Sequence, residues 1–97
     1  MKFNIDASGT SYHGVNINTT PQKLIDILGE PDYFTNDGSD KTNMDYSLET
    51  DNGVKFTIYD WKEYQSLNLN DTYEFHIGGN NMSDCNTAVR ELRRMGV

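Results

Sequence analysis

Three short runs of alternating apolar and polar residues, at 43–49, 54–59 and 72–77, constrain the fold of this chain more than any other feature. A period of two residues places the apolar side chains on one face of a β-sheet and the polar side chains on the other. The Asn52-Gly53 pair joins the first two runs and favours the positive φ angles of a tight hairpin turn. We therefore predict three consecutive antiparallel strands that share one apolar face.

A first helix is predicted immediately after residue 19. Thr19 suits its N-cap, Pro21 suits its first turn, and Gln22 stands three residues after Thr19 in capping-box spacing. Gly29 provides a left-handed stop. So short a helix gains its stability by docking on a sheet.

A second helix is predicted at residues 83–95. Ser83 or Asp84 serves as its cap, and basic residues near its end complement the helix dipole. Apolar residues, Cys85 among them, recur at helical spacing and are expected to pack on the sheet.

Two further alternating runs, at 2–7 and 11–18, predict strands that pair as an N-terminal hairpin, and residues 33–42 are predicted to be a turn or mobile loop. The element order is then β(β)-α-β-β-β-α. This order predicts a single α+β domain over residues 1–97, with an antiparallel sheet of three to five strands and both helices packed on one face.

The chain is acidic, with 15 acidic and 8 basic residues and a net charge of −7. A general nucleic-acid binder needs a basic surface, so direct nucleic-acid binding is not expected. Eight acidic residues and one lysine lie between Asp26 and Asp51. This charge serves solubility or, alternatively, mimics the charge of DNA.

The compartment is predicted from what the sequence contains. Cys85 is the single cysteine, which excludes an intrachain disulfide and fits a reducing cytoplasm. No apolar run reaches the roughly 18 residues that span a bilayer, and no signal peptide is apparent. We therefore expect a cytoplasmic protein without membrane contact.

The best candidate binding residues are Tyr59, Trp61 and Tyr64, with Lys62 between them. Aromatic rings beside a lysine at the end of a strand can stack a base and neutralise a phosphate. Alternatively, Trp61 fills the core at the edge of the sheet while the Lys62 stem lies along it.

His76 is expected on the outer face, where it either contacts a ligand or forms a cross-strand hydrogen bond with Tyr59 or Thr57. Gly78 and Gly79 follow it and are predicted to form the turn into the second helix. Free backbone N–H groups in such a turn suit a phosphate or carboxylate, although a tight turn alone explains the glycines as well.

No catalytic residue, metal ligand or cofactor is predicted. The two histidines and Cys85 lie too far apart in sequence for a recognisable metal site. Cys85 with His76 is a conceivable catalytic pair, but the helical pattern places Cys85 in the core.

Three sequence features together resemble small uncharacterised proteins encoded by tailed bacteriophages. They are the unit T-x-x-x-L-x-x-x-L-G-E-P at 20–31, the stretch TIYDWKEY at 57–64 and the stretch FHIGG at 75–79. Those proteins carry a Y-D-W-K-x-Y … H-I-G-G pattern. The resemblance implies a phage accessory protein that acts in the bacterial cytoplasm, where such proteins commonly counter host defence or redirect host enzymes.

These observations lead to one expected function and two alternatives. We expect a homo-oligomeric anti-defence protein that sequesters a nucleotide-derived host signal in a pocket built on residues 59–79. One alternative is an acidic inhibitor that mimics DNA or docks a basic host protein. The other is a small enzyme that degrades the signal with His76 as general base.

Overall fold

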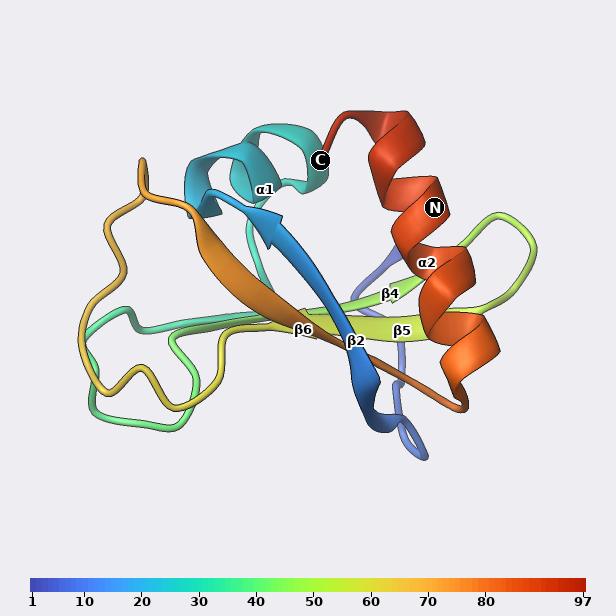
Figure 1. Ribbon diagram of the computed structural model, residues 1–97, viewed down its shortest axis with the longest axis horizontal. Helices are drawn as coiled ribbons and strands as arrows, with labels where there is room; N and C mark the ends of the chain where they lie inside the picture. The colour runs from blue at the N-terminus through green and yellow to red at the C-terminus, as the bar shows by residue number, and fades with distance from the viewer.

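In the computed structural model, which describes residues 1–97, two helices pack on one face of a six-stranded antiparallel sheet (Figure 1). The strand order is β1-β4-β5-β6-β2, and β3 also pairs with β4. The predicted α+β class is confirmed. The predicted element order matches except for β3, an additional strand after the first helix, so the predicted count of three to five strands was too low. The elements are β1 (Lys2–Phe3), β2 (Ser11–Thr19), α1 (Pro21–Leu28), β3 (Tyr33–Phe34), β4 (Met44–Glu49), β5 (Lys55–Tyr59), β6 (Tyr73–Gly79) and α2 (Met82–Met95).

Strands β4, β5 and β6 form the predicted antiparallel meander. Tyr46 of β4 lies opposite Ile58 of β5, which in turn lies opposite Ile77 of β6, and all three side chains are buried. In the turn between β4 and β5, Gly53 has a φ of +85°, and its N–H donates to the Thr50 carbonyl at 2.9 Å. The alternating pattern thus predicted both these strands and the face that each side chain occupies.

A hydrophobic core of 15 buried residues joins the sheet to both helices. Leu24 and Leu28 enter it from α1, and Cys85, Ala88 and Leu92 enter it from α2. Each large side chain that is buried contributes about 1.5–3 kcal/mol, so docking stabilises helices this short. Neither helix combines the length and apolar character needed to cross a membrane.

The helix caps differ by a residue or two from those predicted. Thr20, not Thr19, caps α1 and accepts a hydrogen bond from the Lys23 N–H at 3.0 Å, while Gln22 bonds to Asp26 instead of closing a capping box. Thr19 is instead the last residue of β2. Likewise α2 is capped not by Ser83 or Asp84 but by Asn81, whose side chain accepts from the Asp84 N–H at 2.8 Å.

Strands β1 and β2 do not form the predicted hairpin. β1 pairs with β4 at one edge of the sheet, whereas β2 pairs with β6 at the other edge. Residues 4–10 connect the two edges, and the Ile5 N–H donates to the Ser47 carbonyl at 3.3 Å. A period of two identifies a strand but not its partner, and each side of the meander offers unpaired backbone groups to a further strand.

Two loops, residues 35–43 and 60–67, are joined to each other by polar contacts, and we call them the paired loops. The Asn36 side chain donates to the Leu67 carbonyl at 3.1 Å and accepts from the Leu67 N–H at 2.6 Å. The stretch predicted as a turn or mobile loop at 33–42 therefore begins with strand β3 and continues into a loop fixed by side-chain hydrogen bonds.

The carboxylate of Asp60 is fully buried at the centre of the paired loops. It accepts hydrogen bonds from the Asn43 N–H, the Asn43 side-chain amide and the Met44 N–H, at 2.7, 2.9 and 3.0 Å. The Asn43 amide also donates to the Gln65 carbonyl, and its oxygen accepts from the Gly38 N–H, both at 3.0 Å. We call these contacts the Asp60–Asn43 network.

The network predicts that Asp60→Ala strongly destabilises the protein, because buried N–H donors at Asn43 and Met44 would lose their acceptor. We expect the free energy of unfolding to fall by about 2–4 kcal/mol, measured by urea denaturation. Asp71→Ala is the matched control, since the Asp71 side chain is exposed and makes no hydrogen bond. Equal stability of the two variants would contradict the role assigned to Asp60.

Candidate functional site

The two helices cover one face of the sheet and leave the other uncovered (Figure 1). The candidate site lies on the uncovered face, to which the side chains that alternate with the buried ones of β4 and β5 belong. Cross-strand pairing aligns four polar or aromatic residues there, one from each neighbouring strand. Asp45 of β4 lies opposite Tyr59 of β5, which lies opposite His76 of β6, which lies opposite Asn16 of β2. Side chains alternate between the two faces along each strand, so the residues that do not enter the core lie together on this face.

Four rings gather around this row, and we call Tyr12, Tyr59, Trp61 and His76 the aromatic group. Tyr12 stacks on His76 with ring centroids 3.9 Å apart, and Tyr59 contacts His76 edge-on at 5.4 Å. The ring centroid of Trp61 lies 6.0 Å from that of Tyr59 and 6.3 Å from that of His76. Because 41% of Trp61 is exposed, the alternative that places it in the core is wrong.

Two lysines from the paired loops lie beside the exposed indole. The Nζ atoms of Lys41 and Lys62 are 5.9 and 5.5 Å from the Trp61 ring centroid, within range of a cation–π interaction. The two ion pairs of the chain are made by Met1 and Lys2, so both ammonium groups lack a carboxylate partner. They are therefore available to an anion that binds next to the ring.

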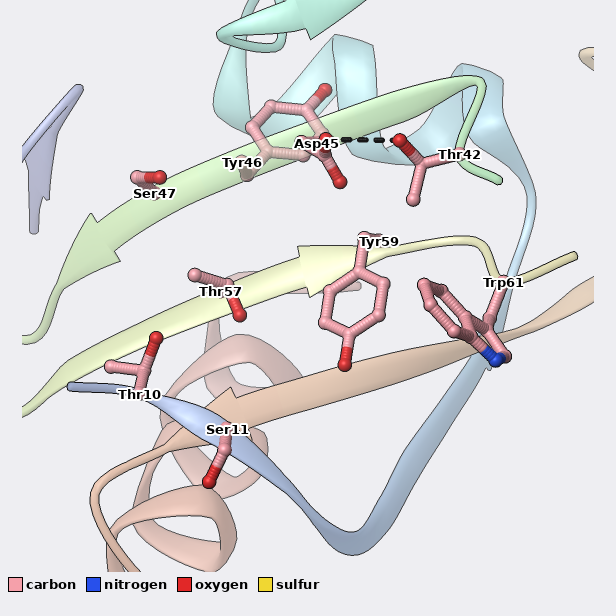
Figure 2. Close-up of a pocket in the computed structure, with 9 residues that line it drawn as sticks. All are labelled: Thr10, Ser11, Thr42, Asp45, Tyr46, Ser47, Thr57, Tyr59 and Trp61. Atoms are coloured by element: carbon pink, nitrogen blue, oxygen red, sulfur yellow. Dashed lines mark hydrogen bonds between the residues drawn. The ribbon is translucent and has the colours of Figure 1, made fainter. Parts of the chain in front are cut away.

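A pocket of about 380 Å³ opens next to the aromatic group (Figure 2). Its size lies within the range of small-molecule sites. In Figure 2, Asp45 and Tyr59 extend from neighbouring strands and Trp61 stands at one end. The pocket is lined by Thr10, Ser11, Thr42, Asp45, Tyr46, Ser47, Thr57, Tyr59 and Trp61.

The carboxyl group of Asp45 is the most strongly perturbed acid on this face. Burial raises its pKa to about 6, and the negative charges of Asp60, Asp40 and Asp32 act in the same direction. A hydrogen bond from the Thr42 hydroxyl to Asp45 Oδ2, at 3.1 Å, opposes the shift. Asp45 therefore changes charge close to the physiological pH range.

His76 favours its neutral form. Burial lowers the pKa of its imidazole, and the charge of Glu74 offsets this only in part. The predicted cross-strand hydrogen bond to Tyr59 or Thr57 is absent. His76 instead contacts Tyr59 in a T-shaped arrangement and stacks on Tyr12. The ring acts here as part of an aromatic surface.

Of the predicted site residues, the structure brings together Tyr59, Trp61, Lys62 and His76. Tyr64 is 57% exposed and contacts no ring of the aromatic group.

Gly78 and Gly79 do not form the predicted turn with free N–H groups. Both are buried within β6 and pair with β5 and β2. A Cβ on Gly78 would lie 2.3 Å from Thr57 Oγ1, and one on Gly79 would lie 2.8 Å from Cys85 Sγ. The first glycine therefore makes room for a pocket hydroxyl and the second for the close approach of α2.

Several residues of the site were not predicted from the sequence, among them Tyr12, Lys41, Thr42 and Asp45. Tyr12 reaches His76 only through the pairing of β2 with β6, which no local pattern specifies. Asp45 could have been predicted, because the alternating run at 43–49 places it on the polar face of the sheet, where it lies beside Tyr59.

Two of the four non-glycine residues with a positive φ lie in the loop that follows Trp61. Lys62 and Tyr64 have φ angles of +55° and +52°, a left-handed conformation that costs a non-glycine residue about 1–2 kcal/mol. The Lys62 N–H donates to the Lys41 carbonyl at 2.7 Å, which fixes this conformation and joins the two lysine-bearing loops. Strain of this kind is typical of ligand-binding sites.

No protein-family model, curated protein or solved structure matches this chain significantly. No group of three or more His, Cys, Asp or Glu side chains is placed to hold a metal ion. The function must therefore be argued from the aromatic group, the two lysines and the pocket.

The raised pKa predicts that Asp45→Asn stabilises the fold above pH 6. Between about pH 4 and 6 the native state keeps a proton on Asp45 that the unfolded chain has lost, so the ionised group lowers stability at higher pH. We expect the free energy of unfolding to rise by about 1 kcal/mol at pH 7.5, because the partly exposed carboxylate keeps much of its hydration. The gain should vanish at pH 3.5.

Urea denaturation at both pH values measures this difference. Glu30→Gln is the control, since it removes one negative charge at an exposed site without hydrogen bonds. If the free energy of unfolding of Asp45→Asn rises no more than that of Glu30→Gln at pH 7.5, burial of the Asp45 carboxylate does not lower the stability of the fold.

Proposed function

We propose that this protein is a phage-type anti-defence protein that acts in the bacterial cytoplasm, binding and sequestering a nucleotide-derived host signal on the helix-free face of its sheet. The observation that carries the proposal is the exposed Trp61 indole with the Lys41 and Lys62 ammonium groups beside it. Stacking of a base on an aromatic ring and attraction of phosphate by adjacent cations is the usual chemistry of nucleotide binding without catalysis.

Sequestration is favoured over cleavage by the surroundings of His76. Its imidazole contacts three aromatic rings and makes no hydrogen bond with another residue. A general base needs a partner that orients it and a reachable proton, and the rings around His76 supply neither. The resemblance to phage proteins supports the biological setting of the proposal.

A homo-oligomer is part of the proposal. The pocket lies on an uncovered face, and the chain is small enough that a shared interface would add stability. A second copy placed over the aromatic group would enclose a ligand that one copy leaves partly exposed.

The proposal is tested by native mass spectrometry of the protein, alone and with cyclic oligonucleotides and ADP-ribose derivatives. We expect an intact nucleotide to be retained at fixed stoichiometry on an oligomer. An altered ligand mass would indicate an enzyme, and no retained nucleotide would contradict the proposal.

The same measurement on Trp61→Ala should show affinity reduced by about 10- to 100-fold, because stacking on a ring contributes about 1–3 kcal/mol per base. The fold should remain, since the side chain is exposed. Tyr64→Ala is the matched control, because it removes an exposed ring outside the aromatic group. Equal affinity in both variants would exclude Trp61 from the site.

Lys62→Asn is predicted to separate binding from stability. Asparagine adopts the left-handed conformation more readily than lysine, so the free energy of unfolding should rise by about 0.5–1 kcal/mol. Affinity for a nucleotide should fall by about three- to tenfold with the loss of one phosphate contact. Lys23→Gln, an exposed change on α1, should alter neither quantity.

An acidic inhibitor of a basic host protein is the second candidate function. The observation that favours it is that most carboxylates between Asp26 and Asp51 are exposed, and only Glu49 and Asp51 are in ion pairs. Their field would attract a basic surface. Native mass spectra without any retained nucleotide would favour this function.

A further inference from the structure

Asp45 stands apart from the other residues that line the pocket. Of the nine lining residues, it alone carries a charge, whereas the others offer hydroxyl groups or rings. It projects from β4 directly opposite Tyr59, one of the rings on which a base would stack. Any base held against the aromatic group would therefore meet a single carboxyl group.

The Asp45 carboxyl group is oriented and has free acceptor capacity. The Thr42 hydroxyl donates to Oδ2 at 3.1 Å, while Oδ1 has no partner within the chain. The only buried side-chain oxygen or nitrogen without a partner is Oγ1 of Thr19, so Oδ1 of Asp45, a residue that lines the pocket, is accessible to solvent. A carboxylate accepts about four hydrogen bonds in all, which leaves room for two donors from a ligand.

No cation of the chain satisfies this carboxylate. The two ion pairs involve other residues, and the two nearby lysines lie over the Trp61 ring. When a carboxylate is partly desolvated and has no cation beside it, two adjacent N–H donors stabilise its negative charge most effectively. Guanine presents two adjacent N–H donors, at N1 and N2, whereas each other common base sets an acceptor beside its donor.

We propose that Asp45 recognises the base of the bound nucleotide and selects guanine, whose N1–H and N2–H groups both donate to the Asp45 carboxylate. This inference rests on the nucleotide binding proposed above and narrows its ligand class to guanine nucleotides. Thr42 acts as a positioning residue, because its hydroxyl donates to one oxygen of this carboxyl group.

The ionisation of Asp45 makes the inference testable by pH. The titratable groups that lie opposite Asp45 in the sheet are Tyr59 of β5 and Tyr33 of β3, and the charges that act on it are the carboxylates of Asp32, Asp40 and Asp60. With a pKa of about 6, Asp45 is ionised at pH 7.5 and accepts both guanine donors. Once protonated it would suit adenine instead, donating to N1 and accepting from N6, so the sign of the pH effect identifies the base.

The experiment titrates the protein with cyclic GMP and cyclic AMP at pH 7.5 and pH 5, following the fluorescence of Trp61, the only tryptophan. Both ligands carry the same phosphodiester, so their affinity ratio cancels effects of His76 and the lysines. We expect cyclic GMP to bind about 10- to 100-fold more tightly at pH 7.5, the discrimination of a bidentate side chain–base pair. At pH 5 the ratio should fall about tenfold.

Asp45→Asn should abolish both the preference and its dependence on pH, while Glu30→Gln should change neither. Equal binding of the two ligands to the parent protein would overturn the base assignment but leave nucleotide binding standing. A preference for cyclic AMP that grows below pH 6 would also overturn it. If neither ligand changes the fluorescence at millimolar concentration, the proposed nucleotide site itself fails, and the base assignment fails with it.

Discussion

The buried carboxylate of Asp60 is the interaction on which the rest of the candidate site depends. It accepts from backbone donors at the start of β4 and from the Asn43 side chain, which itself bonds to both paired loops. A buried charge without a cation is stable only when hydrogen bonds replace its hydration, and here three donors do so. The loops thus have a polar centre in place of an apolar core.

The apolar core and the Asp60–Asn43 network each fix a different part of the candidate site. The core under the helices fixes the strands, and therefore the row that contains Asp45, Tyr59 and His76. The Asp60–Asn43 network fixes the paired loops that carry Lys41 and Lys62. The left-handed backbone of Lys62 is a local cost that the network offsets, and it places an ammonium group beside the indole.

The sequence predicted those parts of the fold that depend on local pattern. The meander, its inward and outward faces, and the start of α1 near Pro21 followed from periodicity and turn chemistry. The partners of β1 and β2 did not, because strand pairing across a sheet is decided by tertiary packing. For the same reason no local pattern predicts the contact of Tyr12 with His76. Gly78 and Gly79 do not form the predicted turn, because the absence of their side chains permits close packing inside the sheet.

The charge of the chain limits what such a site binds. A net charge of −7 repels polyanions, although salt at physiological strength screens this repulsion beyond about 8 Å. The two lysine ammonium groups lie 5.9 and 5.5 Å from one indole, so they act on a neighbouring phosphate at a distance where screening is weak. A compact ligand with few phosphates gains this local attraction, whereas a nucleic-acid strand would extend past the acidic residues between Asp26 and Asp51. Because stacking does not depend on charge, the proposed site would favour a small nucleotide over a polymer.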